Sequence, residues 1–237
     1  MELAIDTSSN LCSLALSHKG ELLKELTWRT AKNHTVEVTS KLAYLLASAK
    51  VKPDSLKAII VAKGPGSFNG LRVGMSIAKG IAFSLNIPLF GISTLEVAAY
   101  SFAYTMLPLC PIHEAGHDEI AAALYQQRCD EWYCWEEEHL TTLENLCQQI
   151  NQETLFCGEI SPDIARKIER SLGNRAIIAQ TSASLSQAGS LAMLGWQKLD
   201  RGEKHDLATL QPLYLRPPNI TKPKKRRIIN GSSPTKF

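Results

Sequence analysis

Three short segments of the chain contain residues whose types and spacing can support chemistry. The first is His113-Glu114-Ala115-Gly116-His117, which has the His-Glu-x-x-His spacing of zinc metallopeptidases. The second is a glycine-rich stretch between Lys63 and Gly74, and the third is Asp6-Thr7-Ser8 near the amino terminus. Each of them also has a purely structural interpretation, so residue type alone makes none of them a site.

The histidine motif binds zinc when it lies on a helix, where both histidines share one face and Glu114 is the general base. Pro111 comes two residues before the motif and Gly116 lies inside it, and both disfavour a helix. No third ligand follows at the spacing of the longer protease motif, although residues 136–139 include a glutamate and a histidine. We therefore predict a solvated turn and no metal ligands. A zinc peptidase built on His113, Glu114 and His117 is the alternative.

The glycine-rich stretch reads Gly-Pro-Gly-Ser-Phe-Asn-Gly from Gly64 to Gly70 and continues as Leu-Arg-Val-Gly. It leaves a predicted strand and enters a predicted helix, whose free N–H groups can bind an anion. The glycine spacing is neither that of a Walker A loop nor that of the dinucleotide fingerprint. The residues themselves leave a plain strand-to-helix turn and a phosphate site equally open.

The elements that position these segments follow the order β-β-β-α-β-α-β-α in the first half of the chain. Apolar runs between turn residues predict the strands, and apolar residues at helical spacing predict the helices. The predicted strands cover residues 3–6, 12–16, 22–28, 58–62 and 88–92, and the predicted helices cover 35–49, 70–85 and 94–104. A meander on one side of a mixed sheet and βα crossovers on the other form a ribonuclease-H-like unit.

The second half has a similar order of elements without a residue-level repeat. Strands are expected at 109–112, 121–125, 132–135, 154–157 and 176–179, with helices at 143–150, 164–172 and 184–199. We predict a degenerate second copy of the first unit, and hence an α/β protein of two lobes with mixed sheets flanked by helices. The predicted boundaries are 1–107 for the first lobe, 108–216 for the second and 217–237 for a flexible tail.

Charge and composition separate the tail from the body. From Arg216 onward there are seven basic residues and no acidic residue, which leaves 19 basic against 23 acidic residues in the rest. The tail is also rich in proline and serine, a composition that does not order itself. Its run Lys222-Pro-Lys-Lys-Arg-Arg227 suits RNA phosphates or a solubilising extension equally well.

The body has the composition of an ordinary globular protein, with 44% apolar and 21% charged residues. No run approaches the roughly 20 apolar residues of a membrane span, and the amino terminus lacks the pattern of a signal peptide. The six cysteines are scattered, and we expect them to be reduced core residues. The expected location is the cytoplasm.

The glycine-rich stretch resembles the signature of the TsaB (YeaZ) family, which usually has Thr where this chain has Asn69. Several other segments occur in the order of that family. They are Leu3-Ala-Ile-Asp-Thr-Ser8, the helix from Asn33-His34 to Leu46, Ile92-Ser-Thr-Leu-Glu-Val-Ala-Ala99 and Pro212-Leu-Tyr-Leu-Arg216. The resemblance covers residues 1 to about 217. Members of the family usually have Asp-Ala-Arg-Arg-Gly-Glu-Val-Tyr, within a strand-turn-strand, where this chain has residues 113–125. Roles that belong to the family's two arginines are therefore not assigned to residues of this chain.

The resemblance implies an actin-like (ASKHA) fold and a non-catalytic subunit. Such a subunit pairs with a catalytic paralogue, TsaD, and an ATPase, TsaE, or with itself when it is alone. The assembly transfers threonylcarbamoyl from its adenylate to the adenosine beside the anticodon of ANN-decoding tRNAs. The catalytic paralogue has a metal-binding His-x-Glu-Gly-His motif after the strand that corresponds to residues 89–92, whereas this chain has Ser93-Thr-Leu-Glu-Val. We therefore expect no catalytic residues.

The resemblance also implies two groups of binding residues. Weak ATP or ADP binding, with no firm cofactor, would use Asp6, Thr7, Ser8, Gly64, Gly66 and Ser67. The local alternative is a turn in which Asp6 and Ser8 bond to their own backbone, and a free-standing actin-like ATPase is a third function. The helices at 35–49 and 71–85 would pack against the paralogue through Val38, Leu42, Leu45, Leu71, Met75, Ala78 and Ala82.

Overall fold

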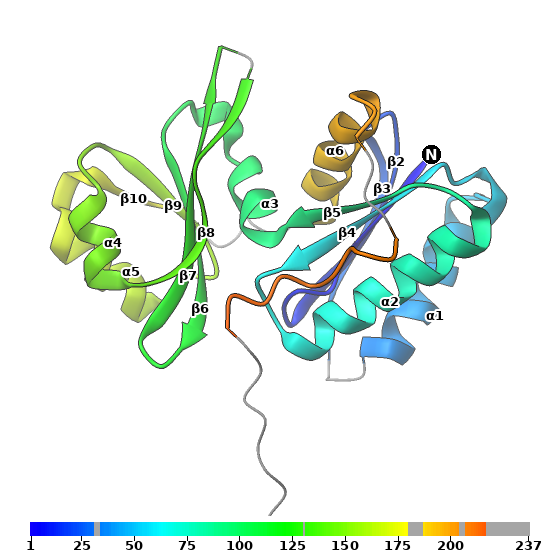
Figure 1. Ribbon diagram of the computed structural model, residues 1–237, viewed down its shortest axis with the longest axis horizontal. Helices are drawn as coiled ribbons and strands as arrows, with labels where there is room; N and C mark the ends of the chain where they lie inside the picture. Colours follow the sequence, from blue (N-terminus) through cyan, green and yellow to red (C-terminus); the bar gives the residue numbers. More distant parts are fainter. Residues whose placement is uncertain (31–33, 130, 180–186, 204–206, 217–237) are drawn as a thin grey trace, which may run out of the picture.

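The computed structural model describes residues 1–30, 34–129, 131–179, 187–203 and 207–216. They form two five-stranded mixed sheets, one in each lobe, with helices on both faces of each sheet (Figure 1). Among the described helices, none is both long and apolar enough to cross a bilayer. The tail at 217–237, with its basic run, lies outside the described residues.

The first sheet has the strand order β3-β2-β1-β4-β5. Its strands are β1 (Glu2–Asp6), β2 (Leu11–His18), β3 (Glu21–Arg29), β4 (Ala58–Gly64) and β5 (Leu89–Ser93). The first three form the antiparallel meander, while β4 and β5 run parallel to β1. Alternate residues of β1 and β4 point to opposite faces, so each face of this sheet carries its own apolar core.

The second sheet repeats this pattern, with the order β10-β9-β6-β7-β8. Its strands are β6 (Leu109–Gly116), β7 (Glu119–Arg128), β8 (Glu131–Thr142), β9 (Thr154–Gly158) and β10 (Ala176–Ile178). Again the first three are antiparallel and the last two run parallel to the first. The predicted duplication of a ribonuclease-H-like unit is therefore confirmed, although the strands of the predicted hairpin are longer than expected.

The helices α1 (His34–Ser48) and α2 (Phe68–Leu85) cover one face of the first sheet, and α4 (Leu143–Gln149) and α5 (Pro162–Leu172) cover one face of the second. Short 3-10 turns lie at η1 (Pro53–Ser55), η2 (Ala103–Thr105) and η3 (Gly173–Arg175). The third helix of each unit behaves differently. Helix α3 (Thr94–Tyr100) packs against the second sheet, and α6 (Gln187–Asp200) packs against the first.

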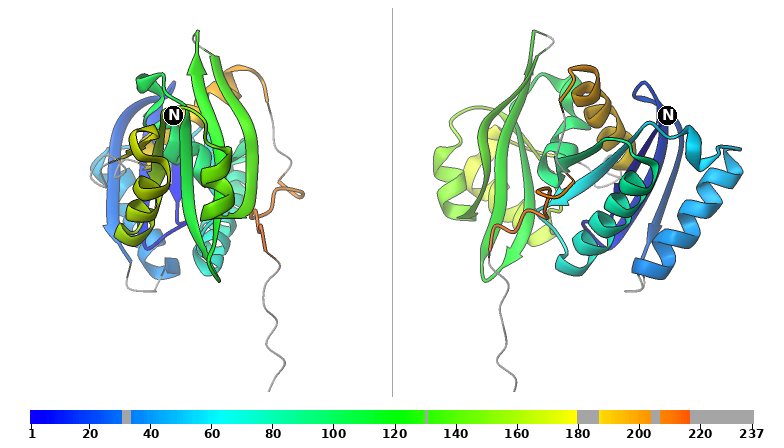
Figure 2. Two further views of the ribbon diagram at one scale, coloured as in Figure 1. Left: turned by 90° about the vertical axis from the view of Figure 1, so that its left-hand side faces the viewer. Right: turned by 45° about the vertical axis from the view of Figure 1, so that its right-hand side comes forward.

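This exchange of helices changes the predicted lobe boundaries. Residues 187–200 were assigned to the second lobe, but Ala188, Leu191 and Leu194 of α6 are buried against Ala4 and Ile60 of the first sheet. Leu210 also packs into the first lobe. Residues 207–216, in orange in the right-hand view of Figure 2, run from the first lobe, where Leu213 bonds to Lys63, toward the strands of the second, where Arg216 pairs with Glu119. The chain thus enters the second lobe after α3 and returns to the first before it ends.

The cysteine expectation is confirmed only in part. Cys12, Cys110, Cys147 and Cys157 are buried, but Cys129 and Cys134 are exposed. The two exposed thiols lie at the end of the β7–β8 hairpin, which extends beyond the core of the second lobe (Figure 1).

The placement of α6 can be tested at Gly195. A Cβ at this position would collide with the buried side chain of Ile60 on β4. We expect Gly195→Ala to lower the free energy of unfolding by about 1–3 kcal/mol through overpacking, measured by urea denaturation.

Gly80 on α2 is the matched control, because a Cβ there would meet no atom within 4 Å. Gly80→Ala should raise the stability by up to about 1 kcal/mol through helix propensity alone. If Gly195→Ala behaves in the same way as Gly80→Ala, then α6 is not packed on the first sheet as described.

Candidate functional site

The glycine-rich stretch joins the end of β4 to the start of α2. Ser67 caps this helix, and its side chain accepts a hydrogen bond from the Gly70 N–H at 3.3 Å. The Ser67 N–H donates to the carbonyl oxygen of Ser8 at 2.6 Å. The stretch is therefore bonded to the end of β1, and the structure brings the two predicted nucleotide-binding segments together.

Close packing explains two of the glycines. A Cβ at Gly66 would collide with the backbone of Ser8, and a Cβ at Gly74 would collide with the Thr7 hydroxyl. That hydroxyl donates a hydrogen bond to the Gly70 carbonyl at 2.8 Å. Glycine is needed here because the backbone of α2 and its preceding turn lies directly on residues 7 and 8.

Asp6 is completely buried beneath this contact. Its Oδ1 accepts hydrogen bonds from the N–H of Ser8 at 2.8 Å and from the Ser8 hydroxyl at 2.6 Å. Its Oδ2 has no partner among the described residues. Burial raises the pKa of the Asp6 carboxyl, and this desolvation outweighs the two Ser8 hydrogen bonds, which lower it.

The bond from Asp6 to the Ser8 backbone is the local turn expected from the sequence. Asp6, Thr7 and Ser8 are each at most 1% exposed. The Thr7 and Ser8 hydroxyls donate hydrogen bonds to the Gly70 carbonyl and to Asp6 Oδ1, and the Ser8 N–H also donates to Asp6 Oδ1. Nucleotide binding by these three residues with Gly64, Gly66 and Ser67 remains a prediction.

The histidine motif does not form the helix that a zinc peptidase requires. His113 to Gly116 belong to β6, and the chain reverses direction at His117 and Asp118, whose φ angles are 56° and 58°. The helical zinc motif is therefore wrong. The predicted turn is confirmed at His117 and Asp118, whereas His113 to Gly116 form the end of a strand. Within the described ranges, no group of three or more His, Cys, Asp or Glu side chains is arranged to hold a metal ion.

His113 instead pairs with Glu159, which follows β9. Its Nδ1 lies 3.0 Å from Glu159 Oε2. The hydrogen bond from His113 is the main reason why the pKa of Glu159 lies below its usual value. This pair joins β6 to the residue that follows β9, its parallel neighbour, and no local sequence pattern predicted it.

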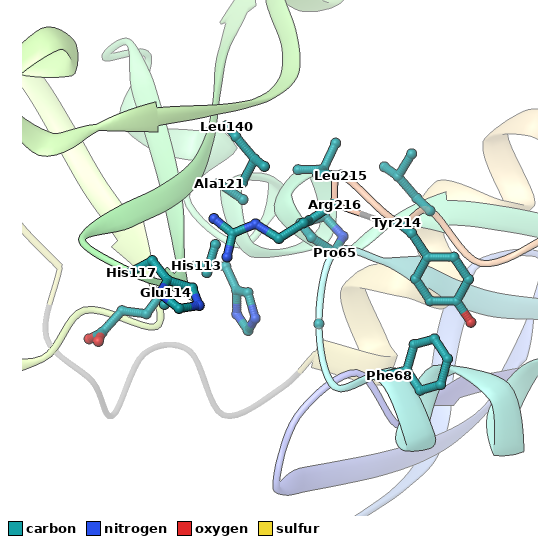
Figure 3. Close-up of a pocket in the computed structure, with 14 residues that line it drawn as sticks. Pro65, Phe68, His113, Glu114, His117, Ala121, Leu140, Tyr214, Leu215 and Arg216 are labelled. Carbon is teal, nitrogen blue, oxygen red and sulfur yellow. The ribbon is translucent and has the colours of Figure 1, made fainter. Parts of the chain in front are cut away.

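A cleft of about 560 Å³ lies between the lobes, beside the glycine-rich stretch. One wall consists of Pro65, Gly66 and Phe68, and residues 213–216 line another side. The opposite wall is the end of β6 from His113 to Gly116, together with His117 of the β6–β7 turn (Figure 3). The positive charge of Arg216 is already engaged by Glu119 of β7. The cleft is therefore largely apolar, with two histidines on one wall.

The predicted partner-interface residues are found in the core. Val38, Leu45, Met75, Ala78 and Ala82 are at most 4% exposed and belong to the first-lobe core, and Leu42 is half-buried against it. Leu71 is also buried, at 1% exposed. The apolar stripe of each helix faces the sheet, so these side chains are not available to a partner. A charge at Leu45 or Met75 would enter the core.

Other apolar residues of the same two helices are exposed. Val36 and Tyr44 of α1 are 71% and 62% exposed, and Phe83 of α2 is 80% exposed. Around them are small residues that are also exposed, namely Ser40, Ala43 and Ala47 on α1 and Ser76 and Gly80 on α2. We call Val36, Tyr44, Phe83 and these small residues the outer helical face. Helical periodicity alone did not identify it, because both faces carry apolar residues.

The raised pKa of Asp6 predicts a specific dependence of stability on pH. In the unfolded chain the carboxyl ionises at its ordinary pKa, whereas in the folded chain it stays protonated to higher pH. The stability of the wild type should therefore fall, relative to Asp6→Asn, as the pH rises from the ordinary carboxyl range through the folded-state pKa. Denaturant titrations at a series of pH values measure this difference.

Asparagine keeps an oxygen that can accept both Ser8 hydrogen bonds, so the variant isolates the ionisation. Asp54→Asn, at an exposed position in η1, is the control and should show no comparable trend. A difference between wild type and Asp6→Asn that does not change with pH would contradict the prediction.

The chain matches one protein-family model, described as tRNA N6-adenosine threonylcarbamoyltransferase (TsaD), over residues 28–223. A transferase of that name from Nitratidesulfovibrio vulgaris is 35% identical over 109 residues, which cover 40% of this chain and 30% of that protein.

The similarity to TsaB proteins extends further along both chains. The tRNA threonylcarbamoyladenosine biosynthesis protein TsaB of Bacillus subtilis is 30% identical over 217 residues, which cover 90% of this chain and 93% of that protein. The solved structure of YeaZ from Pseudomonas aeruginosa superposes with a TM-score of 0.76 at 25% identity, over 90% of this chain and 99% of that one. The chain belongs to the TsaB (YeaZ) family.

Proposed function

We propose that this chain is a non-catalytic subunit in the biosynthesis of threonylcarbamoyladenosine in tRNA. The observation that carries the proposal is the match to TsaB of Bacillus subtilis, which covers nine-tenths of both chains. The match to the transferase of Nitratidesulfovibrio vulgaris covers 40% of this chain. The similarity to TsaB is therefore a similarity of whole proteins, while the similarity to the transferase is partial.

The environment of α3 supports a role without catalysis. Ser93 ends β5 and caps α3, accepting hydrogen bonds from the N–H groups of Leu95 and Glu96. This is where the family resemblance places the metal-binding histidines of the catalytic paralogue. Here Leu95, Val97 and Ala99 are buried in the cores between the sheets, so the start of this helix serves packing.

The partner we propose is a TsaD-like catalytic paralogue that docks on the outer helical face. Val36, Tyr44 and Phe83 expose aromatic and apolar surface beside small side chains, which allow a helix of another protein to approach closely. Large exposed apolar side chains grouped in this way are typical of interaction sites. A second copy of this chain would cover the same face when the paralogue is absent, and a TsaE-like ATPase would complete the assembly.

The reaction we propose for the assembly is transfer of threonylcarbamoyl from its adenylate to the adenosine beside the anticodon of ANN-decoding tRNAs. The basic run at 222–227 would then contribute to tRNA binding in the cytoplasm. Five cations within six residues suit a chain of phosphates, whereas the body of the protein has more acidic than basic residues.

The outer helical face can be tested with Tyr44→Glu and Phe83→Glu. A carboxylate at a docked interface must lose its water, while in the free subunit it stays solvated. We expect each substitution to weaken binding to the TsaD-like paralogue from the same cell by about tenfold or more, measured by isothermal titration calorimetry. Circular dichroism should show that both variants remain folded, because both side chains are exposed.

Tyr104→Glu is the matched control. Tyr104 lies in η2, outside α1 and α2, and is 79% exposed, close to the exposure of Phe83. This variant should bind with the wild-type affinity. If Tyr44→Glu and Phe83→Glu both bind with the wild-type affinity, the outer helical face is not the docking site. If the wild-type chain does not bind the paralogue either, the proposed partner is wrong.

The tail can be tested by truncation before Lys222. Counterion release makes log K fall with log[salt] in proportion to the number of phosphates contacted. We expect the truncated subunit, within its complex, to bind tRNA more weakly and with a smaller salt slope. Replacing the five cations by glutamine at full length should have the same effect. If the full-length and truncated subunits bind tRNA with the same affinity at every salt concentration, the tail does not contact tRNA and is a solubilising extension.

A further inference from the structure

The carboxyl-terminal segment at 207–216 is anchored to the first lobe. Leu210 is 8% exposed and packs against Gly91 of β5, where a Cβ would collide with it. The N–H of Leu213 donates to the carbonyl oxygen of Lys63 at 2.6 Å. The carbonyl of Leu213 in turn approaches Gly64 so closely that no side chain fits there. This end of the segment is thus fixed to the end of β4.

The next residues cross the mouth of the interlobe cleft (Figure 3). The Tyr214 ring lies 5.0 Å from the ring of Phe68, and its hydroxyl accepts a hydrogen bond from Arg72 Nε at 3.1 Å. The Arg72 guanidinium also lies over Phe68, 4.0 Å from the ring centre. Tyr214 therefore rests on the first turns of α2. Leu215 follows and packs against the core beneath the second sheet.

After Leu215, the segment makes a second contact with the second lobe, and this one is polar. Arg216 forms an ion pair with Glu119, the first residue of β7. The two side chains are 32% and 38% exposed, so water and salt compete for the pair. The other contacts of the segment are the backbone hydrogen bond of Leu213, the ring contact and exposed hydrogen bond of Tyr214, and the apolar packing of Leu215. The Arg216–Glu119 pair is the ionic contact between the segment and β7, and therefore the one that salt weakens directly.

The hairpin of β7 and β8 has a second, apolar junction with the first lobe near its other end. Trp132 of β8 stacks on Tyr125 of β7 with ring centres 5.4 Å apart, and its edge meets Tyr100 of α3 at 5.2 Å. Tyr100 in turn accepts a hydrogen bond from Gln197 of α6 at 2.7 Å. Trp132 therefore packs against both helices that lie between the sheets.

The two junctions are separated along one strand, β7, which pairs with β6 on one side and β8 on the other. Tyr125 comes six positions after Glu119 on β7, a separation of about 20 Å in extended chain. The cleft lies beside the β6–β7 turn, at the Glu119 end. A small rotation about the aromatic junction would therefore displace the β6–β7 turn and change the width of the cleft.

We propose that residues 213–216 form a latch that holds the cleft at its observed width, with the Arg216–Glu119 ion pair as its releasable end. When the pair breaks, Leu213 stays attached to Lys63 and the β6–β7 turn moves away from the glycine-rich stretch. Because Tyr214 contacts α2, a molecule that binds the first turns of α2 acts on the same latch. The proposal depends on contacts within this chain and is independent of the proposed partner.

Hydrogen–deuterium exchange of the full chain tests the latch. In Arg216→Ala, amides of the β6–β7 turn at 116–121 should exchange roughly two- to fivefold faster, the range expected for loss of a partly exposed ion pair. The Leu213 amide should keep its protection. High salt should raise exchange of the turn in the wild type toward that of the variant. The radius of gyration from X-ray scattering should increase in Arg216→Ala.

Two further variants decide whether the effect belongs to the pair. Arg216→Glu combined with Glu119→Arg restores opposite charges and should return exchange of the turn to the wild-type rate. Arg166→Ala removes an exposed ion pair with Asp163 inside the second lobe and should leave the turn unchanged. Unchanged exchange and radius in Arg216→Ala would overturn the latch, and so would a double charge reversal whose exchange is faster than that of either single variant.

Discussion

The contact between the glycine-rich stretch and the end of β1 determines the position of most functional surfaces in this protein. Backbone atoms of Gly66 and Ser8 meet with no room for a side chain, and the Ser67 N–H to Ser8 bond fixes the first turn of α2. The first turns of α2 contact Tyr214 through Phe68 and Arg72. Phe83, near the end of the same helix, belongs to the outer helical face. A shift of this contact would move the outer helical face and the wall of the interlobe cleft together.

The same contact leaves the polar residues at the end of β1 in a dry environment. One carboxyl oxygen of Asp6 accepts the two hydrogen bonds from Ser8, while the other oxygen has no partner among the described residues. Leaving a buried carboxyl partly unsatisfied is expensive, and in this protein the cost appears as a raised pKa. The end of β1 therefore acts as a packing site whose polarity is only partly compensated, next to a cleft whose walls come from other segments.

Much of the fold could be predicted from the sequence because turn-forming residues separate the apolar runs of each unit. The β-branched run at 58–62 and the glycine-rich stretch after it predicted β4 and the start of α2, and Pro111 with Gly116 predicted the turn at the histidine motif. The packing of α6 could not be predicted in this way, since its apolar stripe fits either sheet equally well. The choice depends on tertiary contacts such as that of Gly195 with Ile60.

The candidate site was less accessible to sequence reasoning. Val38, Leu45 and Met75 were expected at an interface, but they fill the core, because a helix with apolar residues on two faces does not reveal which face meets its sheet. The pairs His113–Glu159 and Arg216–Glu119 join residues 46 and 97 positions apart. No local pattern specifies such pairs, and they follow only once the two sheets are in place.

The exchange of third helices has a consequence for how the chain is made. The second lobe is an insertion within the first, because four buried residues of α6, Ala188, Leu191, Ala192 and Leu194, belong to the core on one face of the first sheet. During synthesis the strands β1 to β5 emerge early, yet Ala4, Ala15 and Ile60 remain uncovered until nearly the whole chain has been translated. The inserted lobe can complete its own sheet before α6 packs on the first sheet. Folding on the ribosome would therefore end near the amino-terminal lobe rather than begin there.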